Sequence, residues 1–296
     1  MTRILAALLV AVLPFGAVAA GHNKAHVARL TNDFTKDGEP NLQSTGVLVL
    51  DPTTGQTLFS KNADTAAPIA SLTKLMTAMV VLDANLNMDE AIEITREDVD
   101  TFKNSSSRLP VGSHFRREDL LRLALMASDN RAASALGRTY PGGLPAFVDA
   151  MNAKAHALGA SNTHYVDASG LNPGNMSTPA DLGKIVAAAS NYGRIREFTT
   201  TGALSVQLPD SKRKLTFVNT NVLVRHSDWK IGLSKTGYIT EAGKCLVMQA
   251  IIANSPVVIV LLDSWGRLTR VGDANRIRKW LERNPDKLAG AAFKPT

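Results

Sequence analysis

The spacing of hydrophobic positions changes along the chain from a period of two to a helical period and back again. Residues 46–50 and 57–60 are strand-like runs on either side of the turn sequence Asp-Pro-Thr-Thr-Gly, which predicts a β-hairpin. After Ser71, apolar residues recur at helical spacing through Leu82 and leave almost no polar side, which predicts a buried helix. An early pair of strands is therefore followed by a helix of the core.

Helical patterns continue to about residue 200, and strand patterns return after it. The clearest predicted helices cover residues 118–126, 144–158 and 179–190, and a capping threonine and a proline mark the start of the last one. The predicted strands that follow cover residues 204–208, 215–218, 231–239, 245–253 and 257–262, and a closing helix covers residues 275–283. Strands at both ends with helices between them predict an α+β fold, in which one sheet is covered by helices and carries an inserted helical lobe.

The first twenty residues have the composition of a secretory signal peptide. A positive start precedes an apolar stretch over residues 4–15, and small residues follow up to an expected cleavage near Ala19 or Ala20. An uncleaved anchoring helix is the alternative, but the apolar run is short and is interrupted by proline and glycine. We therefore expect a signal peptide over residues 1–20, a mature protein in the periplasm, and a loose polar lead-in over residues 21–42.

The composition of the 296 residues excludes several classes of protein. Hydrophobic residues make up 45% and charged residues 20%, which is ordinary for a globular protein, and no second apolar run is long enough for a stable membrane anchor. The net charge of +7 is spread along the chain and aromatic residues are only 5%, so nucleic acid is not an expected partner. The single Cys245 excludes both a disulfide scaffold and a cysteine metal cluster.

The sequence Ser-x-x-Lys occurs three times, and only one copy lies at the start of an apolar helix. On a helix this spacing places a hydroxyl and an amine on one face, where burial and a nearby cation can lower the pKa of the lysine and make it a base. Ser71 and Lys74 open the predicted buried helix, whereas the copies at residues 211–214 and 227–230 lie in polar segments beside predicted strands. Context therefore separates Ser71 and Lys74 from the other two copies.

Two further short motifs offer groups that could complete such a site. The sequence Ser-Asp-Asn at residues 128–130 follows a predicted helix; its serine could relay a proton and its asparagine could hold a carbonyl, although caps and turns use the same residues. The sequence Lys-Thr-Gly at residues 235–237 lies within a predicted strand, where glycine is costly unless a backbone or ligand comes close. A strand that ends in a turn is the simpler explanation of this second motif.

The three motifs follow one another in the order that is the signature of penicillin-binding proteins and serine β-lactamases. The wider sequence resembles the D-alanyl-D-alanine peptidase family of low-molecular-mass penicillin-binding proteins. Besides a loop over residues 166–171, the segments that carry this resemblance are residues 68–83, 128–143, 217–224 and 232–248. The resemblance covers about residues 43–285 and implies a penicillin-binding serine peptidase domain with a β-lactamase/transpeptidase-like fold and an antiparallel sheet, followed by a tail at residues 286–296.

The resemblance also implies a role for each site residue. Ser71 would attack the carbonyl after a D-alanine in a peptidoglycan stem peptide and Lys74 would take its proton, so that an acyl-enzyme forms, which water then hydrolyses. Ser128 would pass a proton to the leaving amine. The residues expected to bind the substrate, or a β-lactam antibiotic in its place, are Asn130, Lys235, Thr236, Gly237 and Tyr238. The backbone N–H groups of Ser71 and Tyr238 would stabilise the oxyanion, and no metal or organic cofactor is expected.

The length of the chain favours one branch of this family. Its carboxypeptidases usually add a β-rich domain and an amphipathic anchoring helix, for which residues 266–296 are too short, so the layout is similar to the endopeptidase branch of the penicillin-binding protein 7 type. Cleavage of D-alanyl crosslinks is therefore expected, and D-alanyl-D-alanine carboxypeptidase action is the alternative. A β-lactamase is less expected because no Glu-x-x-Leu-Asn sequence is present. A non-catalytic wall-binding or penicillin-sensing module would not require Lys74.

Overall fold

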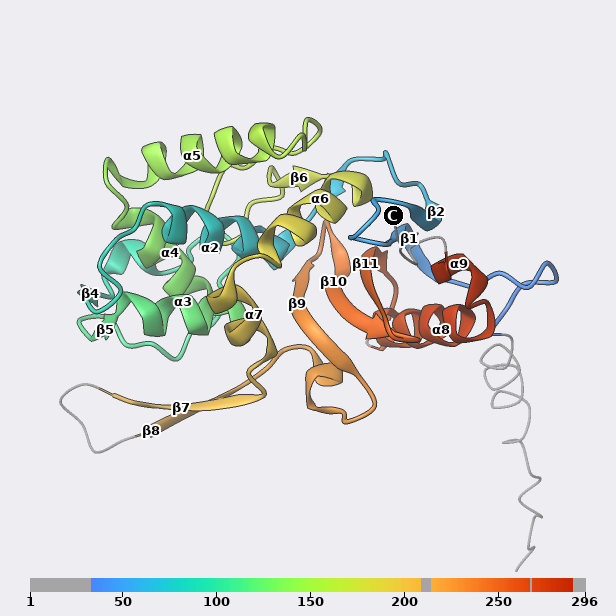
Figure 1. Cartoon of the computed structure of the whole chain (residues 1–296). Coiled ribbons are helices and arrows are strands. Elements are labelled where there is room, and N and C mark those ends of the chain that lie inside the picture. Colours follow the sequence, from blue (N-terminus) through green and yellow to red (C-terminus); the bar gives the residue numbers. More distant parts are fainter. Residues whose placement is uncertain (1–32, 209–213, 267, 290–296) are drawn as a thin grey trace, which may run out of the picture. The chain divides into compact units, whose positions relative to one another are not determined.

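The structure is a computed structural model that describes residues 33–208, 214–266 and 268–289, and it divides into two compact units at residue 41 (Figure 1). In the described part of the first unit, Phe34 and Pro40 form an isolated antiparallel bridge. The predicted signal peptide, most of the lead-in and the end of the tail lie outside the described residues. All that follows concerns the second unit.

The centre of the second unit is a five-stranded antiparallel sheet with the strand order β2-β1-β11-β10-β9. The strands are β1 (Ser44–Leu50), β2 (Thr57–Lys61), β9 (Lys230–Ile239), β10 (Gly243–Ile252) and β11 (Ser255–Ser264). Residues 257–262 of β11 are buried without interruption, so both faces of this central strand are covered. The prediction of one sheet from both ends of the chain is confirmed, and β9 is an edge strand.

Helices supply both the cover of the sheet and a lobe beside β9 (Figure 1). The lobe contains α2 (Lys74–Asp83), α3 (Arg117–Met126), α4 (Asn130–Arg138) and α5 (Gly143–Ala157). Two further helices, α6 (Pro179–Ala189) and α8 (Thr269–Arg283), pack against the sheet. Helix α2 is buried from its first residue through Val81, because it has no polar face and the surrounding helices pack against it. The predicted buried helix is therefore the core of the lobe.

The capping signal that precedes α6 is also confirmed. The side chain of Thr178 accepts a hydrogen bond from the backbone N–H of Asp181, and a proline occupies the first turn. Both signals lie within the first residues of α6, which is why the sequence located the start of this helix to the residue.

The structure differs from the predicted elements in the pairing of two strands. Strands β7 (Ala203–Gln207) and β8 (Lys214–Val218) form a separate two-stranded hairpin and do not join the main sheet. Their side chains alternate between exposed and more buried positions, so one face of the hairpin remains open to solvent. Period-two alternation identifies a strand but not its partner, and the assumption of a single sheet for all strands was wrong here.

Short elements escaped the sequence patterns. Helix α4 begins directly after Asp129, and two small ladders pair β3 (Ala67–Pro68) with β6 (Met176–Ser177) and β4 (Ala91–Glu93) with β5 (His114–Arg116). The closing helix α8 begins six residues earlier than predicted, and α9 (Asp286–Ala289) lies in the predicted tail. Two- and three-residue strands are too short to show a period. A further helix, α7 (Gly193–Thr200), packs against α3 and leads into β7.

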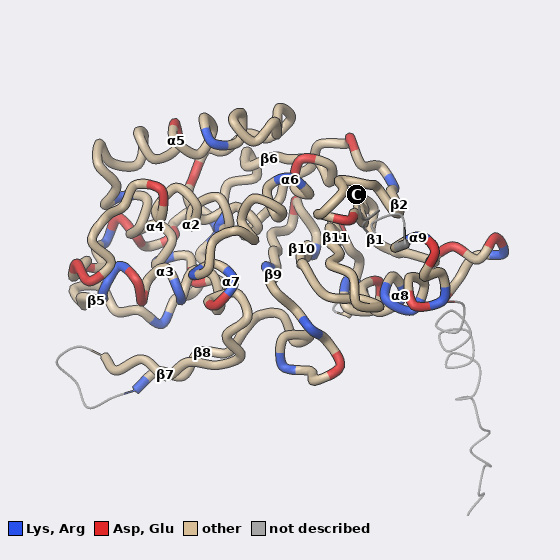
Figure 2. Tube along the Cα trace, viewed as in Figure 1, with Lys and Arg blue, Asp and Glu red and all other residues tan. Residues whose placement is uncertain are grey.

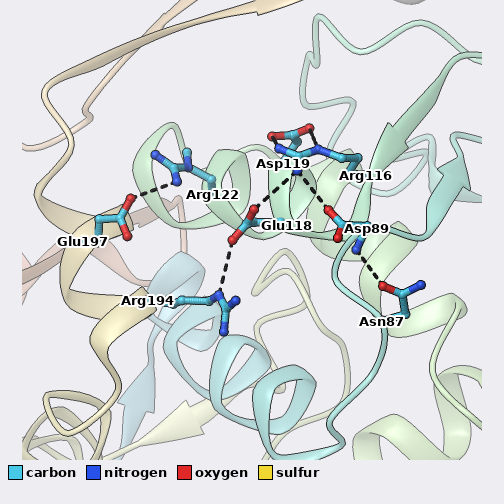
Figure 3. A network of polar contacts seen from close by, with 8 residues as sticks. All are labelled: Asn87, Asp89, Arg116, Glu118, Asp119, Arg122, Arg194 and Glu197. Carbon is cyan, nitrogen blue, oxygen red and sulfur yellow. Dashed lines mark hydrogen bonds and ion pairs between the residues drawn. The ribbon is translucent and has the colours of Figure 1, made fainter.

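A network of ion pairs fixes the outer face of α3 (Figure 3). The guanidinium of Arg116 contacts Asp119 at 3.0 Å, Asp89 at 3.1 Å and Glu118 at 3.6 Å. Glu118 also contacts Arg194 of α7 at 3.3 Å. Single exposed pairs add little stability, but these share partners and join α3 to α7. The network thereby helps to hold the helix whose C-terminal end leads into the Ser-Asp-Asn turn.

Charge is distributed evenly in the described part of the molecule. Lys and Arg positions are interspersed with Asp and Glu along helices and loops, as the tube view shows (Figure 2). None of the helices in residues 33–208, 214–266 and 268–289 combines the length and the apolar composition that crossing a bilayer requires.

Candidate active site

Ser71 and Lys74 lie at the junction of a 3₁₀ turn and helix α2. The 3₁₀ turn η1 spans Ala70–Thr73, and α2 begins at Lys74. The spacing of three residues brings the two side chains together, so that the Nζ of Lys74 lies 2.9 Å from the Oγ of Ser71. Ala70 has a left-handed backbone with φ +48°, a costly conformation for alanine that is typical of functional sites. The turn therefore presents Ser71 at the start of the core helix.

The side chain of Lys74 connects three parts of the chain. It is fully buried, and besides Ser71 its Nζ donates to the Oδ1 of Asn130 at 2.7 Å and to the carbonyl oxygen of Ser169 at 2.6 Å. Both of these oxygens can only accept hydrogen bonds. The lone pair of a neutral Lys74 amine can therefore accept a proton from only one of these three partners, the hydroxyl of Ser71.

Burial tunes Lys74 for this role. Removal of the ammonium from water lowers the pKa of Lys74 to about 7, and the negative charges of Asp167 and Asp129 oppose the shift only in part. A base is most effective when its pKa lies near the working pH. The neighbouring cation that the sequence argument also invoked is not among the main causes of the shift; desolvation is the dominant one.

Ser128 and Asn130 come from the tight turn between α3 and α4. Ser128 has a left-handed backbone with φ +59°, and the carboxylate of Asp129 accepts the N–H of Ala132 as the cap of α4. The Oγ of Ser128 accepts a hydrogen bond of 2.8 Å from the Nζ of Lys235. The simpler cap interpretation is therefore right for Asp129, which caps α4. Its two neighbours contact lysines of the other motifs, and their functional roles stay a prediction.

Lys235 and Thr236 lie near the end of edge strand β9. Lys235 is 1% exposed, and its pKa is lowered well below its usual range, first by burial and then by the positive charges of Lys74 and Arg270. An anionic group bound beside it would offset both effects, because it would favour the ammonium form. The Oγ1 of Thr236 donates to the Oγ1 of Thr220 at 2.7 Å. The strand thus presents a desolvated amine and a hydroxyl to the same region.

The glycine of the third motif allows β9 to approach the nucleophile. A Cβ atom at Gly237 would lie 3.0 Å from the carbonyl oxygen of Ile69 and 3.2 Å from the backbone nitrogen of Ser71. This crowding explains why a glycine stands in the interior of a strand. Gly170 likewise allows its loop to approach the 3₁₀ turn, since a Cβ at this position would lie 2.0 Å from the carbonyl oxygen of Ala70. Two glycines therefore let separate segments meet around the 3₁₀ turn.

Tyr238 follows Gly237 and differs from the other members of the set. Its side chain is 58% exposed and lies under the ammonium of Lys244, which is 4.1 Å from the ring centre. In β9, the backbone of Tyr238 directly follows that of Gly237, which closely approaches the backbone of Ser71. The assignment of its N–H group to an oxyanion hole stays a prediction.

The structure brings all three motifs together and leaves the competing Ser-x-x-Lys sequence apart. Lys74 contacts Ser71 and Asn130, and Lys235 contacts Ser128. Ser227, in the turn before β9, and Lys230, the first residue of β9, are both exposed. The third copy lies almost entirely outside the described residues.

Several residues that support the site were not identified as such from the sequence. The carboxylate of Asp167 accepts the N–H groups of Ser169, Gly170 and Asn172, and this turn directs the Ser169 carbonyl to Lys74. The loop itself was expected near the site, but its internal hydrogen bonds have no periodic signal. The one sequence signal that could have indicated these hydrogen bonds is the Asp-x-Ser-Gly sequence at residues 167–170, which is typical of turns.

Arg270, in the first turn of α8, was also missed. Its guanidinium donates to the carbonyl oxygens of Gly237 at 3.2 Å and of Cys245 at 3.3 Å, so that it supports β9 and β10 behind the third motif. It is separated from Lys235 by two strands, and no sequence pattern marks it. Within the residues that the structure describes, no group of three His, Cys, Asp or Glu side chains could hold a metal ion.

The family model of the D-alanyl-D-alanine carboxypeptidases, peptidase family S11, matches residues 33–265. The chain belongs to this family of serine peptidases. It is 46% identical to a D-alanyl-D-alanine endopeptidase of Pseudomonas aeruginosa over 86% of this chain and 83% of the relative. It is 42% identical to a D-alanyl-D-alanine endopeptidase of Escherichia coli over 84% of this chain and 80% of the relative.

A solved structure of similar fold is the DD-transpeptidase of Streptomyces K15. Its TM-score to this chain is 0.76 at 33% identity, and the alignment covers 82% of this chain and 98% of that one. The D-alanyl-D-alanine carboxypeptidase of Mycobacterium tuberculosis gives a TM-score of 0.73 at 26% identity, with 87% and 94% of the two chains covered. The expected β-lactamase/transpeptidase-like fold is confirmed, and the protein is a serine-type D-Ala-D-Ala peptidase.

Proposed function

We propose that this protein is a penicillin-sensitive D,D-endopeptidase that opens D-alanyl crosslinks between peptidoglycan stem peptides through an acyl-enzyme on Ser71. The observation that carries the proposal is the position of Lys74, which is fully buried and bonded to Ser71 and Asn130 with a pKa of about 7. An amine in this state can take a hydroxyl proton at neutral pH. The endopeptidase activity is supported by two relatives that carry this name.

In the first half of the reaction, neutral Lys74 takes the proton of Ser71 as its Oγ bonds to the carbonyl carbon of a D-alanine residue. The backbone N–H groups of Ser71 and Tyr238 stabilise the oxyanion, with roughly 3 kcal/mol from each donor. The C–N bond then breaks, and the proton that Lys74 took from Ser71 passes through Ser128, whose Oγ is hydrogen bonded to Lys235, to the leaving amine, so that Lys74 is neutral again. The products of this half are a serine ester and the released stem peptide with its free amine.

The second half consumes one water molecule. Water adds to the ester carbonyl while Lys74 takes its proton. The ester C–O bond then breaks, Lys74 returns the proton to the Oγ of Ser71, and the new D-alanine carboxylic acid ionises to its carboxylate. Asn130 holds the substrate amide, and Lys235 with Thr236 attracts a carboxylate on the leaving side; the hydrogen bonds of Asn130 to Lys74 and of Lys235 to Ser128 support these roles. Edge strand β9 offers the backbone groups on which an extended peptide can add as a further strand.

A D-alanyl-D-alanine carboxypeptidase is the second candidate, because the matching family model has this description. Purified mature protein should convert crosslinked muropeptide dimers to monomers faster than it shortens pentapeptides to tetrapeptides. Release of D-alanine from pentapeptides with the dimers left intact would assign the protein to the carboxypeptidases. Rapid hydrolysis of penicillin itself would assign it to the β-lactamases.

We also propose that the enzyme works in the periplasm after cleavage near Ala19 or Ala20, with its catalytic domain over residues 43–285. The N-terminal sequence of the exported protein tests the cleavage. Extraction from the periplasm without detergent tests this location, and fractionation with integral membrane proteins after a high-salt wash would contradict it.

A further inference from the structure

An exposed ion pair joins the two sides of the candidate active site. Lys103 lies in the segment between the 3₁₀ turn η2 (Arg96–Asp98) and strand β5, and its ammonium hydrogen bonds to the carboxylate of Glu241. Glu241 belongs to the turn between β9 and β10. The pair therefore connects a segment of the helical lobe to the far end of the strand that carries the Lys-Thr-Gly motif.

The lobe segment, residues 100–107, is built as a strap. The carboxylate of Asp100 accepts the backbone N–H groups of Phe102, Lys103 and Ser105 at 2.8–2.9 Å, which gives the strap a folded start. Its other end is bonded to the Ser-Asp-Asn turn. The Oγ of Ser105 accepts a hydrogen bond from the Nδ2 of Asn130 at 2.9 Å. The strap thus has the active-site turn as its base and Lys103 as its contact across the site.

The order of groups along β9 indicates which part of a substrate meets this pair. Lys235 and Thr236 attract the carboxylate on the leaving side, and Tyr238 supplies an N–H group at the reacting carbonyl, according to the proposed function on which this inference rests. A peptide that adds to β9 therefore continues on its acyl side toward Ile239 and Glu241. At about 3.3 Å for each residue, only about three acyl-side residues fit before Glu241 is reached.

We propose that the Lys103–Glu241 pair is a reversible strap contact that closes the acyl-side end of the substrate path and lowers the reactivity of long stem peptides relative to short ones. The two side chains are 26% and 40% exposed, so the contact is weak and opens readily. The hydrogen bond from Lys103 holds the pKa of the Glu241 carboxyl below its usual range, which favours the carboxylate form of Glu241. Salt therefore weakens the ion pair.

Two substrates with the same leaving group test the strap. One is an N-acetylated tripeptide that ends in D-Ala-D-Ala, and the other is a disaccharide pentapeptide with the full stem on the acyl side. In Lys103→Met and in Glu241→Gln, we expect kcat/KM for the long substrate relative to the short one to rise by about two- to fivefold, the range of an exposed ion pair. The change should be a fall in KM for the long substrate with kcat unaltered, because the chemical groups are unchanged. Penicillin acylation should stay constant.

Three controls make the result decisive. The charge-swapped variant with Lys103→Glu and Glu241→Lys should return to the wild-type ratio. The ratio should rise with salt in the wild type and not in Lys103→Met. Lys154→Met removes a pair with Asp83 whose side chains are 26% and 41% exposed, outside the site, and should leave the ratio unchanged.

A ratio that stays constant or falls in Lys103→Met and Glu241→Gln overturns the strap. Failure of the wild type to open crosslinked dimers would instead overturn the proposed endopeptidase activity. The two failures are distinguishable, because the two test substrates share one leaving group and differ only in the peptide on the acyl side.

Discussion

The same four-residue pattern, Ser-x-x-Lys, occurs at residues 71–74 and 227–230 in opposite surroundings. Lys74 is fully buried, and three oxygen atoms from separate segments surround its amine. Ser227 and Lys230 are exposed where a turn leads into β9, whose first residue is Lys230. The difference teaches that spacing alone brings a hydroxyl and an amine close together. Catalysis also requires a dry environment, which lowers the pKa of the amine, and hydrogen-bond acceptors, which orient the amine.

The sharpest test of this comparison removes the serine hydroxyl from each of the two Ser-x-x-Lys sequences in turn. Ser71→Ala should abolish covalent labelling by a fluorescent penicillin, because no other hydroxyl contacts Lys74 in the described structure. The fold should be retained, as the thermal unfolding midpoint would show. Ser227→Ala is the matched control and should label like the wild type. Labelling that survives in Ser71→Ala and maps to Ser227 would reverse the assignment.

Removal of the amine is expected to have the next largest effect. Lys74→Met keeps an unbranched side chain of similar length but cannot accept the serine proton, so penicillin acylation should fall by about 10²- to 10⁴-fold. Stopped-flow measurement of the acylation rate tests this, with Lys230→Met as the control that should remain at the wild-type rate. A Lys74→Met enzyme that acylates at nearly normal speed would exclude Lys74 as the base.

The approach of β9 to Ser71 can be disturbed without touching a reactive group. Gly237→Ala places a Cβ 3.0 Å from the Ile69 carbonyl oxygen, so the strand must shift, and acylation should fall by about tenfold to a hundredfold. Gly232→Ala lies in the same strand, and its Cβ would come no closer than 3.8 Å to any group. The two acylation rates should therefore differ widely. Equal rates would show that the close contact at residue 237 is unimportant.

The smallest expected effect is in the pH profile. Lys74 acts as a neutral amine with a pKa of about 7, so the rate of acylation should rise from pH 6 to pH 8 and be about tenfold below its plateau at pH 6. Asp129→Asn keeps a capping side chain but removes a negative charge that raises the pKa of Lys74, and the midpoint should move to lower pH. A midpoint near the ordinary lysine value would contradict the role of burial.

Much of the architecture was determined by local sequence. The hairpin of β1 and β2, the buried α2 and the capped start of α6 each have a signal within a few residues, because period, turn residues and caps act locally. The three motifs were also visible in the sequence, and their order indicated the family. The separate pairing of β7 with β8 had no such signal, since alternation does not specify a partner strand.

The sequence by itself determined which groups are available for chemistry, and the tertiary structure decided which of them share an environment. The carbonyl of Ser169 reaches Lys74 across 95 positions, Arg270 supports Gly237 across 33, and Lys103 meets Glu241 across 138. No local pattern encodes such contacts, because they depend on how the lobe packs against β9. Burial has the same origin: Lys74 loses water only when the core of the lobe and the sheet close around it, and this desolvation changes an ordinary lysine into a base.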